Sequence, residues 1–176
     1  ECSSINEFAE NIAINLENVG VRKTADDVAN YIIGVLAAGL TPLICGFRAR
    51  EIATAISTSY SGEIPYIISL PNGFTDSKRL LEIYQSAESN VILIEDAVGT
   101  MNENALMPLL REKAQRGFFP KLLLMATENI DSVKYMPTNL FNQVALVMVE
   151  EYTLMRDDYE VSDAREVFKD FISYDS

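Results

Sequence analysis

The stretch TPLICGFRAREIATAIS, residues 41–57, joins a short apolar run to an amphipathic segment through a glycine. The run 42–46 is continuously apolar, which is typical of a strand buried on both faces of a sheet. Over residues 49–60, apolar residues such as Ile52 and Ile56 recur at helical spacing. The stretch therefore predicts a strand, a turn of a few residues and a helix.

Downstream of this stretch, continuous apolar runs alternate with segments of helical periodicity. The runs predict four further strands, over 64–70, 90–97, 121–127 and 144–152. The segments between them predict helices over 76–88 and 102–117, the second kinked or delayed by Pro108, and a short irregular or helical piece over 132–143. Such alternation predicts a doubly wound α/β fold, a three-layer sandwich around a five-stranded, mostly parallel sheet.

Helical patterns also flank these strands. Apolar residues at spacings of three and four predict a helix over 5–16, and a second helix is expected to begin at Thr24, with acidic residues in its first turn. A C-terminal helix is predicted over 161–174. We expect one domain, 1–176, with three parts. These are N-terminal helices (1–40), a βα core (41–152) and a C-terminal helical segment (153–176).

The composition is that of a globular protein. The chain has 176 residues, of which 48% are hydrophobic and 23% charged, enough for a real core. No apolar run is long enough to span a bilayer and no secretory signal opens the chain, so we expect a cytoplasmic protein. Two cysteines, Cys2 and Cys45, make no disulfide framework, and Cys45 is expected to be buried. The absence of histidine excludes a Ser-His-Asp triad and a His-ligated metal.

The net charge of -12 limits the partners of the chain. An acidic surface repels phosphate backbones, so we expect no direct binding to nucleic acid or to an anionic membrane. A local basic patch or a basic partner subunit would change that expectation.

Three stretches together resemble a known family. NVILIEDA (90–97), NALMPLLREK (104–113) and KLLLMATEN (121–129) look like the core of an AAA+ ATPase of the P-loop NTPase superfamily. The lead-in ANYIIGVLAAGLTPLICG (29–46) is similar to that of MoxR-type, McrB-type and clamp-loader modules. The resemblance covers about residues 28–152 and implies an AAA+-like fold. It also implies four functional sites.

The first implied site is the phosphate loop, at GFRARE (46–51). Gly46 fits the first glycine of the family's motif, but the second glycine, the lysine and the hydroxyl are absent, and the loop is about three residues short. Arg48 and Arg50 are the candidate phosphate contacts. The preferred interpretation is a tight turn with solvated arginines, because arginine cannot rebuild a backbone cradle that lacks its glycines.

The second implied site is an acidic pair at the end of the third strand. The family has Asp then Glu, for Mg²⁺ and for activation of water, whereas this chain has Glu95 then Asp96. They are the candidate metal ligands and vestigial catalytic residues. The preferred alternative is a pair that caps the next helix or pairs with a nearby arginine.

The remaining two implied sites are weaker still. Thr127 and Asn129 are candidates for the polar residue that orients the attacking water, although turns commonly carry such residues. In MPTNLFNQV (136–144), Pro137 and Leu140 match the family, but residues 141–143 are Phe, Asn and Gln where the trans-acting arginine is expected.

These departures together favour loss of hydrolysis, because each part acts on the same transferred phosphate. We therefore expect a catalytically inactive AAA+-like module, a scaffold or protein-interaction domain, with no cofactor. Its partners would be a protein or other subunits of a larger ATPase assembly. The contact faces would be those around Arg48, Arg50 and the FFPK stretch with Phe118 and Phe119.

Two alternatives stay open. One is a divergent Mg-ATP-binding ATPase, in which Arg48 or Arg50 contacts phosphate and Glu95 and Asp96 hold Mg²⁺. The other, by fold analogy alone, is an accessory domain of a DNA-processing or restriction complex.

Overall fold

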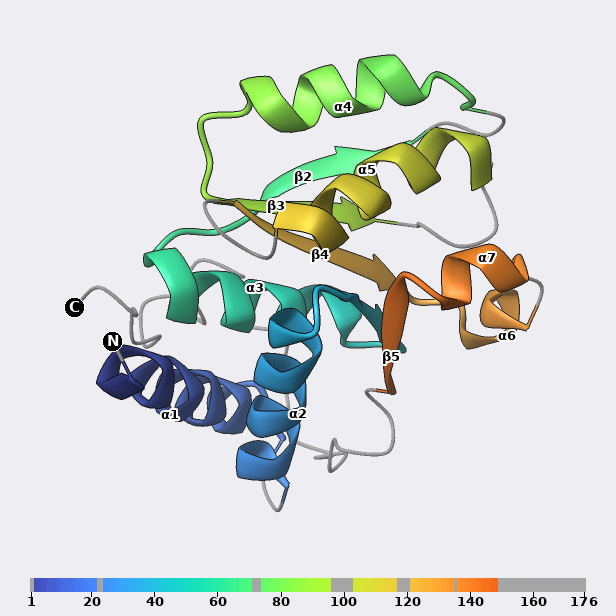
Figure 1. Cartoon of the computed structure of the whole chain (residues 1–176). Coiled ribbons are helices and arrows are strands. Elements are labelled where there is room, and N and C mark those ends of the chain that lie inside the picture. The colour runs from blue at the N-terminus through green and yellow to red at the C-terminus, as the bar shows by residue number, and fades with distance from the viewer. Residues whose placement is uncertain are drawn as a thin grey trace.

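The computed structural model describes residues 2–21, 24–70, 74–95, 103–116, 121–134 and 136–148. The helices are α1 (Cys2–Asn18), α2 (Ala25–Ala37), α3 (Ala49–Ser61), α4 (Ser77–Ser86), α5 (Glu103–Arg116), α6 (Ile130–Val133) and α7 (Thr138–Phe141). The strands are β1 (Thr41–Cys45), β2 (Tyr66–Ser69), β3 (Val91–Glu95), β4 (Leu122–Thr127) and β5 (Val144–Met148). Figure 1 shows their arrangement.

The strands form one sheet in the order β2-β3-β4-β1-β5. Every neighbouring pair is parallel. At the middle of β1, Leu43 lies beside Met125 of β4 and Leu146 of β5. The predicted α/β fold with a five-stranded parallel sheet is therefore confirmed.

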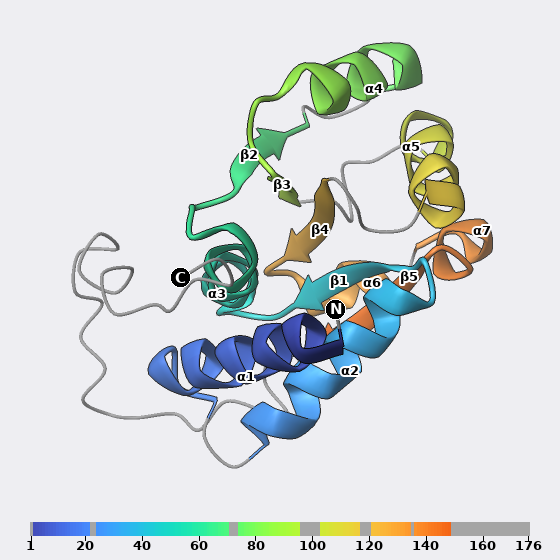
Figure 2. The ribbon, with the colours of Figure 1, turned by 60° about the vertical axis from the view of Figure 1, so that its left-hand side comes forward.

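Helices cover both faces of the sheet, which gives the three layers (Figure 1, Figure 2). Because side chains alternate along a strand, β1 sends Ile44 to one face and Leu43 and Cys45 to the other. The Ile44 face packs against α1, α2 and α3. The Cys45 face packs against α4, α5, α6 and α7, and Cys45 is buried as expected.

The helices α1 and α2 share one core with α3 rather than forming a separate layer. The side chain of Asn15 on α1 donates to the Ser59 hydroxyl on α3 at 2.7 Å, with both side chains buried. On α2, the Tyr31 hydroxyl donates to the Leu146 carbonyl of β5 at 3.1 Å. The N-terminal helices therefore fix the position of α3, whose first turn lies at the candidate site.

Several element bounds differ from the sequence predictions. β2 is shorter than predicted, and it begins after Pro65, whose nitrogen has no hydrogen to donate. The fifth predicted strand is described only to Met148. α5 begins at Glu103 and continues through Pro108, so the proline does not delay its start. Thr24 stands at the N-cap of α2, as predicted, but its side chain makes no capping hydrogen bond. The predicted helix over 161–174 lies outside the described residues.

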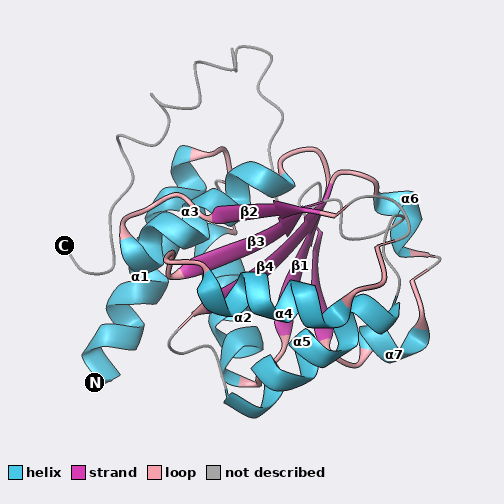
Figure 3. Ribbon diagram, turned by 90° about the horizontal axis from the view of Figure 1, so that it is seen from above, coloured by secondary structure: helices cyan, strands magenta, loops and turns pink. Residues whose placement is uncertain are grey.

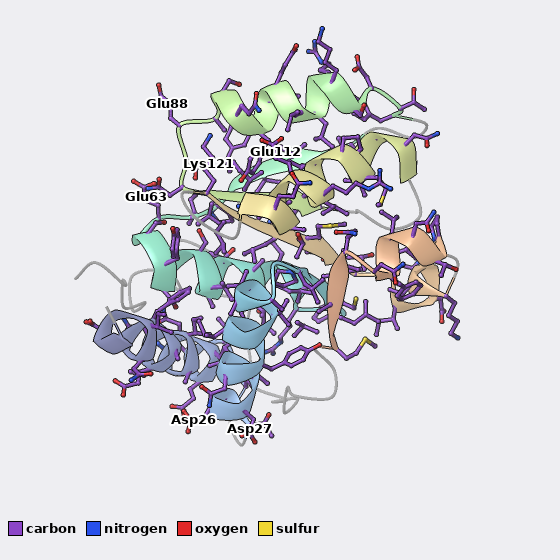
Figure 4. All side chains as sticks on the ribbon, in the orientation of Figure 1. Asp26, Asp27, Glu63, Glu88, Glu112 and Lys121 are labelled. Atoms are coloured by element: carbon purple, nitrogen blue, oxygen red, sulfur yellow. The ribbon has the colours of Figure 1, made fainter. Side chains whose placement is uncertain are left out.

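Acidic side chains project from the surface around the sheet. Figure 4 shows Asp26 and Asp27 pointing away from the start of α2, and Glu63 and Glu88 pointing outward from two loops. The exposed carboxylates are consistent with the negative charge of the sequence. Within the described ranges, no helix is both long enough and apolar enough to cross a membrane.

Candidate functional site

The candidate site lies at the carboxyl edge of the sheet, where the strands end together (Figure 3). β1 leads into α3 on one face, whereas its neighbour β4 leads into α6 and α7 on the other face. Connections that diverge from adjacent parallel strands leave a crevice between them, the usual ligand position in α/β sheets. The two strand ends are tied together, since the Gly46 N–H donates to the Thr127 carbonyl at 2.9 Å.

The connection between β1 and α3 is three residues long, residues 46–48. Gly46 has φ of 128°, a conformation that favours glycine. The Ala49 N–H donates to the Gly46 carbonyl at 3.1 Å, so the turn closes directly on the start of the helix. The tight strand-to-helix turn preferred from the sequence is confirmed, but its arginines are not simply solvated, because each contacts an acceptor within the protein.

Arg48 points back from this turn toward the N-terminal helices. Its Nη1 donates to the Val19 carbonyl at 2.7 Å, in the turn that follows α1. Gly20 lies so close that an added Cβ would stand 2.5 Å from the same nitrogen. One nitrogen of this candidate phosphate contact is therefore used in joining α3 to the α1–α2 turn.

Arg50 points instead to the acidic end of β3. Its Nε lies 2.8 Å from the Glu95 carboxylate, and the exposed fractions of the two side chains are 60% and 18%. Alternation along β3 explains the pairing, because Val91 and Leu93 lie on the α3 face of the sheet and Glu95 continues their row. Pairing of Glu95 with a nearby arginine, one of the two preferred alternatives, is confirmed.

A pocket of about 200 Å³ opens beside this ion pair. It is lined by Ala49, Arg50, Glu95, Ala126, Thr127 and Glu128. Within the sheet, Ala126 lies between Ile44 of β1 and Glu95 of β3, and its small side chain leaves the space open. The pocket therefore brings together Arg50, Glu95 and Thr127, which the sequence analysis had proposed from three separate motifs.

The candidate water-orienting residues contact each other at the end of β4. Thr127 is buried, and its hydroxyl accepts a hydrogen bond from the Asn129 N–H at 3.2 Å. Asn129 itself is exposed. This local turn is the ordinary role of such residues, and the role in orienting water stays a prediction.

The other predicted residues are placed only in part. Asp96, Phe118 and Phe119 lie outside the described residues. Within the described part of the chain, no group of three or more Cys, Asp or Glu side chains gathers to hold a metal, so the Glu95 and Asp96 metal site stays a prediction. The stretch 136–144, where the family has its trans-acting arginine, contains α7, with Leu140 buried and Phe141 exposed.

The sequence interpretation missed Glu51, in the first turn of α3. Its Oε2 is buried and has no hydrogen-bond partner among the described residues. Burial raises the pKa of this carboxyl above its usual 4.5, and the nearby Arg48 opposes that rise. An acid in the first turn of a helix is normally solvated, so nothing in the local pattern signals this burial.

Replacing Glu51 with glutamine is expected to stabilise the protein at neutral pH. A carboxyl whose pKa is raised on folding binds more protons in the folded state, so its contribution to stability falls as pH rises above the unfolded value. The stability gain of Glu51→Gln should therefore grow from about pH 4 to about pH 7 in urea denaturation. A gain that stays constant or shrinks with rising pH would contradict this assignment.

Comparison with known proteins supports the fold. The sequence matches no family model, and it matches no curated protein significantly. The structure is similar to the crystal structure of a proposed ATPase from Cytophaga hutchinsonii ATCC 33406, with a TM-score of 0.50 and 14% sequence identity. The match covers 98% of this chain and 62% of that one, so this chain spans less than two thirds of its neighbour's length. This likeness supports the α/β three-layer fold that the sequence predicts.

Proposed function

We propose that this chain is a catalytically inactive AAA+-like module that serves as a scaffold or protein-interaction domain. The observation that carries the proposal is the three-residue turn between β1 and α3, at the position of the family's phosphate loop. A working loop curls several backbone N–H groups around the phosphates and adds a lysine and a hydroxyl. Three residues cannot supply that cradle.

The charged groups around the turn also support the proposal. Arg48 donates to Val19, and Arg50 pairs with Glu95, so each arginine already has an acceptor within the protein. The mostly buried carboxylate of Glu95 lines the pocket and would repel a triphosphate. At about 200 Å³, the pocket is smaller than the roughly 300–1,000 Å³ typical of sites for small molecules and cofactors.

A protein partner is favoured by Phe47, at the tip of the turn. Its side chain is 76% exposed, the highest value among the large hydrophobic residues of the described ranges. An exposed aromatic on a short turn between two packed elements is a suitable anchor for a protein interface. We propose that Phe47 contacts another protein or another subunit of an ATPase assembly, in the cytoplasm and without a cofactor.

The divergent ATPase remains the second candidate, because the pocket lies at the switch point of the sheet and brings Arg50 and Glu95 together. Isothermal titration with Mg-ATP separates the two functions. The inactive module is expected to bind with a Kd no tighter than about 1 mM. Micromolar binding that is lost in Glu95→Ala would refute it and favour the divergent ATPase.

A further inference from the structure

The Arg50–Glu95 ion pair spans a neighbouring strand. In the sheet, β4 separates β1 from β3, and the Cα atoms of Ile44, Ala126 and Glu95 lie in one row across the three strands. Arg50 begins on α3, just after β1, and reaches Glu95 at the end of β3. The two side chains therefore meet across the end of β4, at the pocket whose lining includes Ala126.

The two partners of the pair are held unequally. Glu95 is the last residue of β3 and its side chain is mostly buried, whereas Arg50 is largely exposed in the first turn of α3. Glu95 thus presents a fixed carboxylate to an arginine that water can reach. A charge-assisted contact to a tethered group is favoured over the same contact to a dissolved anion, because the tethered group has a high effective concentration.

We propose that Glu95 acts as an internal counter-ion, which occupies Arg50 and closes the pocket to external oxyanions such as phosphate. The inference rests on the proposed function, and it names Glu95 as one physical reason why the pocket would bind no nucleotide. When glutamine replaces Glu95, Arg50 becomes available to bind an anion in the pocket, beside the first turn of α3.

The test is a titration of Glu95→Gln with inorganic phosphate, monitored by NMR of the backbone amides of the residues that line the pocket, which every variant retains. The variant is expected to bind phosphate at least roughly tenfold more tightly than wild type, since one charge-assisted hydrogen bond is worth that factor or more. Adding Arg50→Met to Glu95→Gln should abolish the gain. Survival of the gain without Arg50 would overturn the inference.

Glu128→Gln is the matched control, because Glu128 lines the same pocket and its change removes the same charge without removing Arg50's partner. It should alter phosphate binding by less than about twofold, as expected for an exposed, screened charge. An equal gain in Glu128→Gln would mean that net charge alone matters, and the inference would fail. No gain in a folded Glu95→Gln would also overturn it.

A measurement on the unaltered protein tests the ion pair independently of how the variant folds. The Arg50 Nε–H should exchange with solvent more slowly than the Nε–H of the exposed Arg79. Equal exchange rates would show that the ion pair does not form stably in solution, and would contradict the inference. Micromolar Mg-ATP binding by wild type would refute the proposed function itself, whereas failure of the phosphate gain would refute only the counter-ion role of Glu95.

Discussion

Replacing Gly20 with alanine is expected to lower the free energy of unfolding by about 1–3 kcal/mol. Gly20 has a backbone φ of 102°, a conformation that residues with a Cβ rarely adopt. The new Cβ would also stand 2.5 Å from the Arg48 Nη1, which is anchored to the Val19 carbonyl. The substitution must therefore strain the turn after α1 and displace the arginine that joins this turn to α3.

Gly34 on α2 provides the control for this change. A Cβ built at Gly34 meets no atom within 4 Å, and the residue lies in a helix. Gly34→Ala is therefore expected to raise the free energy of unfolding by about 0.5–1 kcal/mol. Urea denaturation of both variants measures the contrast. A Gly20→Ala protein as stable as wild type would show that Arg48 does not hold the α1–α2 turn as described.

Truncation of Ile56 to alanine should have the largest effect on stability, a loss of about 2–5 kcal/mol. Ile56 is fully buried on α3, a helix whose residues from Ile52 to Tyr60 are all buried. α3 packs between the sheet and the N-terminal helices, so a cavity there removes contacts on several sides at once. Guanidinium denaturation measures the loss, and an unchanged dependence of the unfolding free energy on denaturant concentration would show that only stability has changed.

Ile5→Ala on α1 is the comparison for Ile56. Its side chain is 48% exposed, and alanine has the higher helix propensity, so stability should change by less than about 0.5 kcal/mol. If Ile56→Ala cost no more than Ile5→Ala, α3 would not be the central helix of this face.

Much of the fold could be predicted from the sequence, because buried parallel strands read as continuous apolar runs. The runs around Leu43, Leu93 and Leu124 became the three central strands, each buried over most of its length. The edge strand β2 was less accurately predicted, since only one of its sides is paired and Pro65 shortens it. The order of the strands required the structure, because no local pattern encodes which strands are neighbours.

The candidate site was predictable in its residue types and not in its contacts. Gly46, Arg50, Glu95 and Thr127 were predicted from three separate motifs, and all four lie at one edge of the sheet. The two arginines appear equivalent in the sequence, yet Arg48 and Arg50 point to different partners. That difference depends on where α1 and β3 lie relative to the turn, which is tertiary information.

The proposed inactive module requires that the turn after β1 makes no phosphate cradle, and backbone amide NMR can detect such a cradle. Labelled wild-type protein would be titrated with Mg-ATP while the amides of residues 46–51 are followed. These amides form the turn and the first turn of α3, where bound phosphate would have to be held. We expect their chemical shifts to stay unchanged up to about 50 μM Mg-ATP, far below a Kd of about 1 mM or weaker. Saturable shifts confined to these amides, at micromolar nucleotide, would contradict the proposed inactive module.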